Sequence, residues 1–261
     1  MSHHLIVHQH EGGFFSNFNK VITFLESHPE ISKITWNLQG QPFGAFAYDC
    51  GEVFSKLFIS YDENHDFYLE KTYILSEYVD QRYTGRKAHD MYLGDNTWRD
   101  MMYQAVIKYI KPTPFLTSRL IQARQVFKQI GKRPKIGILR RNELLKCEQH
   151  NNSMPVFEQY KLAISQLNLE NPVYVFSVDN LEDLGSFKEL YKPHIHSLNI
   201  RRTQKNTDME PHFLPGTAAD AAAVFMDVHM LAQCDYFIHP VSNMATAALY
   251  MNPKLNSVYL Y

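Results

Sequence analysis

The sequence predicts an α/β protein built on parallel sheets. Short apolar runs typical of buried strands alternate with longer segments of helical pattern, most regularly in the second half of the chain. The length of 261 residues allows one large domain or two domains of roughly 120 to 140 residues. The prolines at Pro112 and Pro114 interrupt a helical pattern, because proline lacks the amide donor and restrains the residue before it. We therefore expect two domains, at residues 1–114 and 115–261.

The first half predicts strands and helices in alternation. A glycine turn at Gly12 and Gly13 separates an apolar run from a helical pattern. The aromatic stretch GQPFGAFAYDCG, rich in glycine and proline, is typical of an ordered loop, and we assign no element to residues 62–80. The expected elements are a strand over 5–7, a helix over 14–27, a strand over 31–36 and a helix over 98–111.

The second half shows the same alternation more clearly. Gly131 marks a helix end, and Thr217 with Asp220 three residues later resembles a capping box at a helix start. The expected elements are helices over 116–130, 156–167, 181–191, 217–233 and 244–251, with strands over 135–139, 173–177, 236–238 and 258–260.

Charge and cysteine content exclude several classes of protein. The 26 basic and 27 acidic side chains nearly balance, so no general surface field favours nucleic acid or an anionic membrane. The three cysteines form no C-x-x-C pair and cannot build a disulfide framework, which favours a reducing compartment. No apolar run reaches the roughly 20 residues of a membrane span, and the N-terminus lacks a signal-peptide pattern. We expect a soluble, cytoplasmic protein.

Two adjacent arginines, Arg140 and Arg141, follow the predicted strand over 135–139. Ligands of open α/β sheets bind at the carboxyl ends of the strands. Successive strand residues point to opposite faces, so we expect one arginine to face the ligand while the other braces the loop or contacts a second ligand group. A guanidinium presents a planar set of donors that matches phosphate oxygens. The alternative is a pair of surface ion pairs with nearby carboxylates.

Ser242 and Asn243 stand between a predicted strand and the next helix, where backbone amides and the helix dipole favour an anion. Together with the arginines they suggest a diphosphate site. Asp227 lies among apolar residues in AVFMDVHMLAQCDYF, and an unpaired carboxylate there would be costly. A guanine edge, with two adjacent N–H donors, would suit it. A solvated helix face or a cap for a nearby loop is the alternative.

Residues 134–253 resemble the α1,6-fucosyltransferase family and its NodZ-type and protein O-fucosyltransferase relatives. The family pattern H-V-R-R-x-D corresponds to ILRRNE at 138–143, which retains both arginines but replaces the histidine and the aspartate. The pattern L-D-I-H-x-L-S-x-x-D-x-x-x-x-x-x-S-S corresponds to the segment from Met226 to Asn243, in which Asp227, His229, Asp235 and Ser242 match in register. VYVFSVDN is similar to V-Y-x-A-T-D-D and retains Asp179.

The resemblance implies a GT-B fold, in which two Rossmann-like domains face each other across a cleft. It implies an inverting, metal-independent transfer of fucose from GDP-fucose to a glycan or other hydroxyl acceptor, with no cofactor besides the donor. Arg140 matches the arginine essential in the family, and Glu148 lies at the spacing of a suspected base, with Glu143 as a competitor. The implied donor-binding residues are Gly12, Gly13, Arg140, Arg141, Asp179, Asp227, His229, Ser242 and Asn243.

Two further observations bear on metals and on rival functions. The chain contains no D-x-D sequence, and its H-x-H pairs lack other ligands at zinc spacing, so we predict no metal site. Because the family histidine is replaced by Ile138, two alternatives remain: a GT-B transferase that uses another nucleotide sugar, or an inactive relative that binds nucleotide or glycan.

Overall fold

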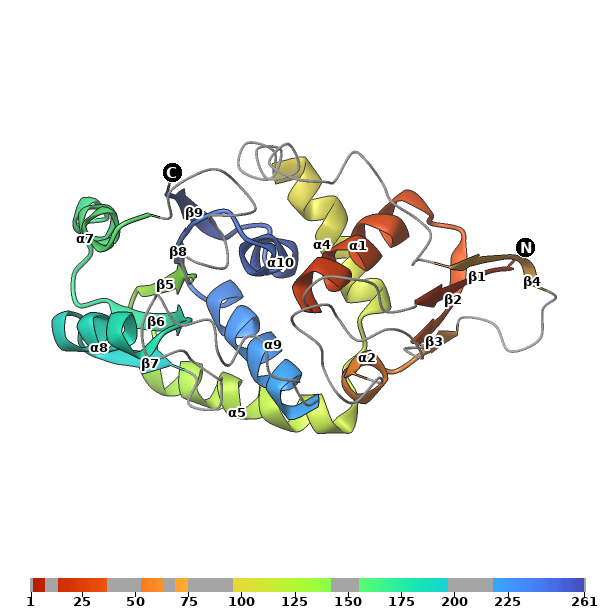
Figure 1. The fold of residues 1–261 in the computed structure, drawn as a ribbon, viewed down its shortest axis with the longest axis horizontal. Helices are drawn as coiled ribbons and strands as arrows, with labels where there is room; N and C mark the ends of the chain where they lie inside the picture. The colour runs from red at the N-terminus through yellow and green to blue at the C-terminus, as the bar shows by residue number, and fades with distance from the viewer. Residues whose placement is uncertain are drawn as a thin grey trace. The chain divides into compact units, whose positions relative to one another are not determined.

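The computed structural model describes residues 2–7, 14–36, 53–62, 69–74, 96–141, 155–196 and 218–260. By packing, the chain divides into two compact units, one of Met1–Arg119 with Leu214–Ala222 and one of Leu120–Phe213 with Ala223–Tyr261. The division falls within α5 and α9 (Figure 1), five residues beyond the predicted boundary at 114. Within the described ranges, no helix has the length and apolar character needed to cross a bilayer.

The first unit contains a four-stranded sheet in the order β3-β2-β1-β4. β1 pairs in parallel with β2 and β4, whereas β3 is antiparallel to β2. The elements are β1 (Ser2–Val7), α1 (Phe14–Ser27), β2 (Ile31–Trp36), α2 (Val53–Leu57), β3 (Tyr61–Asp62), β4 (Leu69–Ile74) and α4 (Asn96–Tyr109).

Helix α1 forms the centre of this unit. Its sequence FFSNFNKVITFLES is amphipathic, yet most of its residues are buried, including the polar Asn17, Asn19 and Thr23. Phe14, Phe18 and Phe58 pack with ring centroids 6.1 to 6.5 Å apart. The hydroxyl of Tyr109 on α4 donates to the carbonyl of Ile31 at the start of β2, 3.1 Å away. The predicted helix 14–27 and strand 31–36 are confirmed, whereas α2, β3 and β4 were not predicted.

The second unit contains a five-stranded, fully parallel sheet in the order β7-β6-β5-β8-β9. This order reverses direction at β5, as in a doubly wound sheet. Its strands are β5 (Lys135–Arg140), β6 (Val173–Val178), β7 (His194–His196), β8 (Tyr236–His239) and β9 (Asn256–Tyr259). The helices that accompany it are α5 (Pro114–Ile130), α7 (Phe157–Gln166), α8 (Leu181–Leu190), α9 (Ala218–Ala232) and α10 (Asn243–Met251). The α/β prediction with parallel sheets is confirmed, and only β7 was missed among these strands.

Alternation along β5 assigns its side chains to two helical layers. Ile136 and Ile138 join a buried cluster with Tyr160 of α7 and Phe187 of α8. Gly137 faces the other layer, since a Cβ there would lie 3.0 Å from Cδ2 of Leu231 on α9. In Figure 1, α7 and α8 lie on one side of this sheet, and α9 and α10 lie on the other. The same alternation continues to the carboxyl end of β5, so Arg140 faces the layer of Ile136 and Ile138, and Arg141 faces the layer of Gly137.

Candidate functional site

The candidate site lies at the carboxyl edge of the second sheet, where β5 and β8 are neighbours and the strand order reverses. β5 ends at Arg140 and is followed by Arg141, while β8 ends at His239 and is followed by the turn into α10. The carboxyl ends of parallel strands, at the point where the strand order reverses, are where α/β sheets bind ligands. Every residue of the site discussed below belongs to the second unit.

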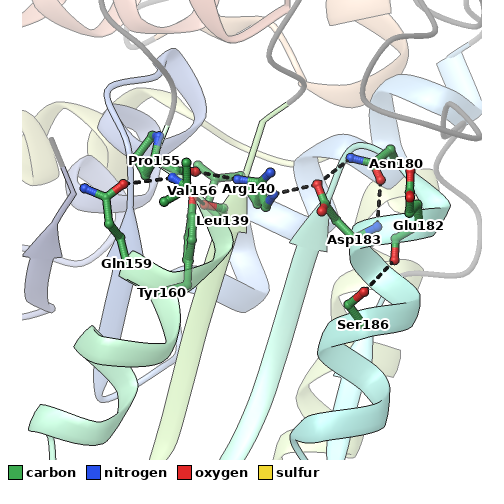
Figure 2. Close-up of polar contacts among 10 residues, drawn as sticks. All are labelled: Leu139, Arg140, Pro155, Val156, Gln159, Tyr160, Asn180, Glu182, Asp183 and Ser186. Carbon is green, nitrogen blue, oxygen red and sulfur yellow. Dashed lines mark hydrogen bonds and ion pairs between the residues drawn. The ribbon is translucent and has the colours of Figure 1, made fainter.

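Arg140 points into the α7 and α8 layer, as Figure 2 shows, and is 3% exposed. Its Nε donates to Oδ2 of Asp183 at 2.5 Å, and its Nη1 donates to the carbonyl of Pro155 at 2.5 Å. The guanidinium carbon lies 5.7 Å from the ring centroid of Tyr160. Two of the five N–H donors of the guanidinium therefore contact protein groups, so at most three are left for a phosphate.

The partners of Arg140 are themselves held in place. Asn180 caps α8: its Oδ1 accepts from the backbone amide of Asp183, and its Nδ2 donates to the carboxylate of Asp183 at 2.7 Å (Figure 2). The hydroxyl of Tyr160 donates to the carbonyl of Leu139 at 3.0 Å. Burial raises the pKa of Tyr160 far above its usual value, so this hydroxyl stays neutral and remains a donor. This network fixes the backbone from which the next residue projects.

Arg141 points to the opposite layer. Its Nη1 lies 3.2 Å from Oδ1 of Asp179 and 2.6 Å from Sδ of Met244, the second residue of α10. Its side chain is 17% exposed, and its Nε has no hydrogen-bond partner in the part of the chain that the structure describes. Of the two arginines, Arg141 is therefore the one beside the start of α10.

Ser242 is the N-cap of α10. Its Oγ accepts from the backbone amide of Ala245 at 3.0 Å, and its carbonyl accepts from Thr246. The cap stabilises the helix start and directs the amides of the first turn outward. Asn243, the first residue of the helix, is exposed. The predicted combination of an arginine with a helix N-terminus is present, and the arginine that completes it is Arg141.

Asp179 and Asp227 are both buried, at 7% and 3% exposed. The backbone amide of Asp179 donates to the carbonyl of Arg140, which joins the ends of β6 and β5. Asp227 lies one turn before Leu231, the residue of α9 that meets Gly137 of the sheet. Because residues four apart share one face of a helix, Asp227 is expected on the sheet-facing side of α9. α9 ends near the first residues of β5, so Asp227 lies closer to the carboxyl edge than Leu231 does.

His229 does not lie with these residues. It lines a surface cavity together with Arg124 and Lys135, and Lys135 begins β5 at the edge opposite Arg140. Residues two apart on a helix point to different sides, so Asp227 and His229 diverge. Burial, and then the charge of Arg124, lower the pKa of His229 to about 4, so its imidazole is neutral at pH 7. The structure thus places His229 away from Arg141 and Ser242, and its contact with the donor stays a prediction.

Four predicted site residues, Gly12, Gly13, Glu143 and Glu148, lie outside the described residues. Sequence reasoning did not find Asp183, Asn180, Tyr160 or Met244. A signal for two of them was available, because an Asn before a helix with an Asp three residues later is typical of an N-cap. Nothing local relates Asp183 to Arg140, from which it is separated by 43 residues.

The chain has a glycosyltransferase fold, that of the GT-B fucosyltransferases, as solved structures that superpose over nearly its whole length show. Fucosyltransferase NodZ from Bradyrhizobium aligns with a TM-score of 0.51 and 12% identity over 97% of this chain and 94% of the other. NodZ alpha-1,6-fucosyltransferase co-crystallized with GDP gives 0.52 and 12%, over 97% and 93%. A mutant of Arabidopsis thaliana FUT1 in complex with GDP gives 0.52 and 9%, over 100% of this chain and 70% of the other.

No protein-family model and no curated protein matches the chain by sequence. The predicted resemblance to fucosyltransferases is confirmed in fold by the structural neighbours alone.

Proposed function

We propose that the chain is an inverting, metal-independent glycosyltransferase that transfers fucose from GDP-fucose to a hydroxyl of a glycan or another acceptor. The observation that carries the proposal is Arg141 beside the N-terminus of α10 at the carboxyl edge of a sheet whose fold is shared with fucosyltransferases. NodZ and Arabidopsis FUT1 have been crystallised with GDP or GDP-fucose, which supports the choice of donor.

In this proposal Arg141 and the first-turn amides of α10 bind the diphosphate. A charged guanidinium and a helix N-terminus both stabilise the negative charge that develops on a departing diphosphate. Arg140 acts as a positioning residue: its buried contacts with Asp183 and Pro155 hold the end of β5, and so the start of Arg141, in place. Asp227, on α9, stays the predicted acceptor for the two N–H donors of the guanine edge.

The reaction forms one bond and breaks one. The acceptor oxygen attacks the anomeric carbon of fucose, the bond from that carbon to the β-phosphate oxygen breaks, and its electron pair leaves with GDP. The proton of the acceptor hydroxyl passes to a carboxylate base, for which Glu148 and Glu143 are the predicted candidates. Exchange of the true base for glutamine is expected to slow transfer on the order of a hundredfold or more and to leave GDP binding unchanged.

Thermal unfolding with GDP, ADP, UDP and CMP tests the donor site. GDP at about 100 times its Kd should stabilise the protein by about 2.7 kcal/mol. A charge-assisted contact contributes about 1.5 to 3 kcal/mol, so Arg141→Gln should weaken GDP binding roughly tenfold or more. Lys161→Gln, which removes an exposed charge on α7, is the matched control and should bind GDP as the unmodified chain does. Equal GDP affinity in both variants would overturn the proposed phosphate site.

The transfer itself is tested with GDP-fucose and a panel of glycan acceptors, by measuring GDP release. Product analysis by NMR should show the anomeric configuration opposite to that of the donor. Chelation of divalent metals with EDTA should leave the rate unchanged. Retention of configuration, or a rate that EDTA abolishes and Mg²⁺ or Mn²⁺ restores, would contradict the mechanism.

A nucleotide-binding relative without transferase activity is the second candidate, and one observation favours it. The arginine that matches the family's essential position, Arg140, contacts Asp183 and the Pro155 carbonyl. Stabilisation by GDP, with neither GDP release nor sugar transfer across the acceptor panel, would support this candidate over the enzyme.

A further inference from the structure

The second unit contains a surface cavity of about 370 Å³ at the opposite edge of the sheet from the site above. α5 and α9 form its walls, and Lys135, the first residue of β5, closes one end. Its volume falls in the range of small-molecule sites. Its lining includes Arg124, Phe127, Lys128, Lys135, His229 and Met230.

The lining combines cations with apolar surface. Arg124, Lys128 and Lys135 are basic, and Asp and Glu are missing from the lining residues. The wider sequence has the same character, because ten lysines and arginines and no acidic residue stand between Asp100 and Glu143. Phe127 and Met230 supply apolar contact area. A ligand that suits this lining carries negative charge at one end and an apolar group at the other.

The charge of the cavity comes mainly from α5. Lys135 already has partners, since its Nζ lies 3.7 Å from Oδ2 of Asp235 and donates to the carbonyl of Arg133 at 3.1 Å. Arg124 and Lys128, one turn apart on α5, form no ion pair with a carboxylate among the described residues. Cations four residues apart on one helix face repel each other, and a bound anion relieves this repulsion.

His229 adds a polar atom without a partner. Its Nε2 is buried and makes no hydrogen bond within the described ranges of the chain. A buried polar atom without a partner is costly, and because solvent does not reach this Nε2, a ligand oxygen in the cavity accepts from the ring N–H only after the ring turns toward the cavity. The imidazole is held neutral by burial and by Arg124, which lower its pKa to about 4, and a neighbouring anion would raise that pKa again.

We propose that this cavity binds the phosphate group of a small phosphorylated molecule with an apolar body, with Arg124 and Lys128 as the charged ligands and with Nε2 of His229 as a donor once its ring turns toward the cavity. A phosphate fits better than a carboxylate, because its three terminal oxygens match the fork of an arginine together with two further donors. The site is independent of the proposed donor site, which lies at the other edge of the same sheet.

Phenyl phosphate is the probe, with phenol as its neutral counterpart, benzoate as the carboxylate and inorganic phosphate as the anion without an apolar body. Binding is followed at low ionic strength, where surface charges are weakly screened, by NMR of the His229 imidazole and by isothermal titration calorimetry. Phenyl phosphate should shift the His229 resonances, raise the pKa of that ring, and bind more tightly than benzoate or inorganic phosphate.

Variants make the test specific. The double substitution Arg124→Gln with Lys128→Gln should weaken phenyl phosphate at least tenfold, and both residues are exposed, so folding is expected to persist. Arg119→Gln, on the same helix but outside the cavity, should leave the affinity unchanged. Arg141→Gln should also leave it unchanged, which separates this site from the donor site.

Four results would overturn the proposal: equal affinity in the double variant and in Arg119→Gln, binding of phenol as tight as that of phenyl phosphate, tighter binding of benzoate, or no response of the His229 resonances.

Discussion

Arg140→Met tests whether the buried arginine holds the fold or binds the donor. The substitution keeps an unbranched apolar stem and removes the guanidinium, so Asp183, whose side chain is 13% exposed, loses its cationic partner. Loss of one member of a buried ion pair costs about 3 to 5 kcal/mol, because the remaining charge stays desolvated. The carbonyl of Pro155 also loses its hydrogen-bond donor, which adds to the loss of free energy of unfolding.

An exposed ion pair in the same unit provides the matched control. Lys161 and Glu158 lie 2.9 Å apart on α7, with side chains 41% and 74% exposed. Lys161→Met should cost at most about 0.5 kcal/mol, since solvent screens such pairs. Equilibrium urea unfolding of the two variants compares these values directly. A double-mutant cycle of Arg140→Met with Asp183→Asn should give a coupling energy of about 1 to 3 kcal/mol.

The same variant has a functional measurement. If Arg140→Met unfolds at the same urea concentration as Lys161→Met but loses GDP binding, the guanidinium contacts the donor and our structural reading of it is refuted. If it loses stability and retains GDP binding under folding conditions, Arg140 is a positioning residue. Arg140→Lys should recover less than half of the lost stability, because lysine cannot serve two partners in a planar fork.

Four further predictions concern stability. Gly137→Ala should destabilise by roughly 1 to 3 kcal/mol in urea, because the new Cβ would lie 3.0 Å from Leu231 Cδ2. Gly185→Ala, within α8 and with no atom near its Cβ position, should instead stabilise by up to about 1 kcal/mol. Ser242→Ala should cost about 1 kcal/mol by removing the cap of α10, and Ser242→Asp should recover most of it. His229, whose folded pKa of about 4 is below its unfolded value, should stay neutral at pH 7 while the chain loses up to about 3 kcal/mol between pH 6.5 and pH 4.

The controls for these predictions lie within the same series. A loss of stability for Gly185→Ala equal to that for Gly137→Ala would show that the contact with α9 is not the cause. Equal melting temperatures for Ser242→Ala and Ser242→Asp would exclude a capping role. The acid-dependent loss attributed to His229 should shrink in His229→Gln. An NMR titration that protonates the ring near pH 6.5 in the folded chain would contradict the burial argument.

The sequence alone determined the fold class and most of the second sheet. Apolar runs such as IGIL and VYVFS, flanked by helical patterns, specify buried parallel strands through local periodicity. The sequence also determined that an arginine pair follows β5 and that Ser242 precedes a helix. Because the carboxyl ends of parallel strands share one edge of the sheet, both features were expected at that edge. β3, with two residues, and β7, with three, escaped prediction because so few residues show no period.

Only the tertiary structure decided which arginine faces which layer. Alternation requires that the two residues diverge, but local sequence does not say which helices cover each face of the sheet. The contact of Arg140 with Asp183 spans 43 residues, and that of Arg141 with Met244 spans 103 residues. The same applies to Asp227 and His229, two positions apart on α9. Such pairings follow from strand order and layer packing, which are properties of the whole sheet and are absent from any single segment of the chain.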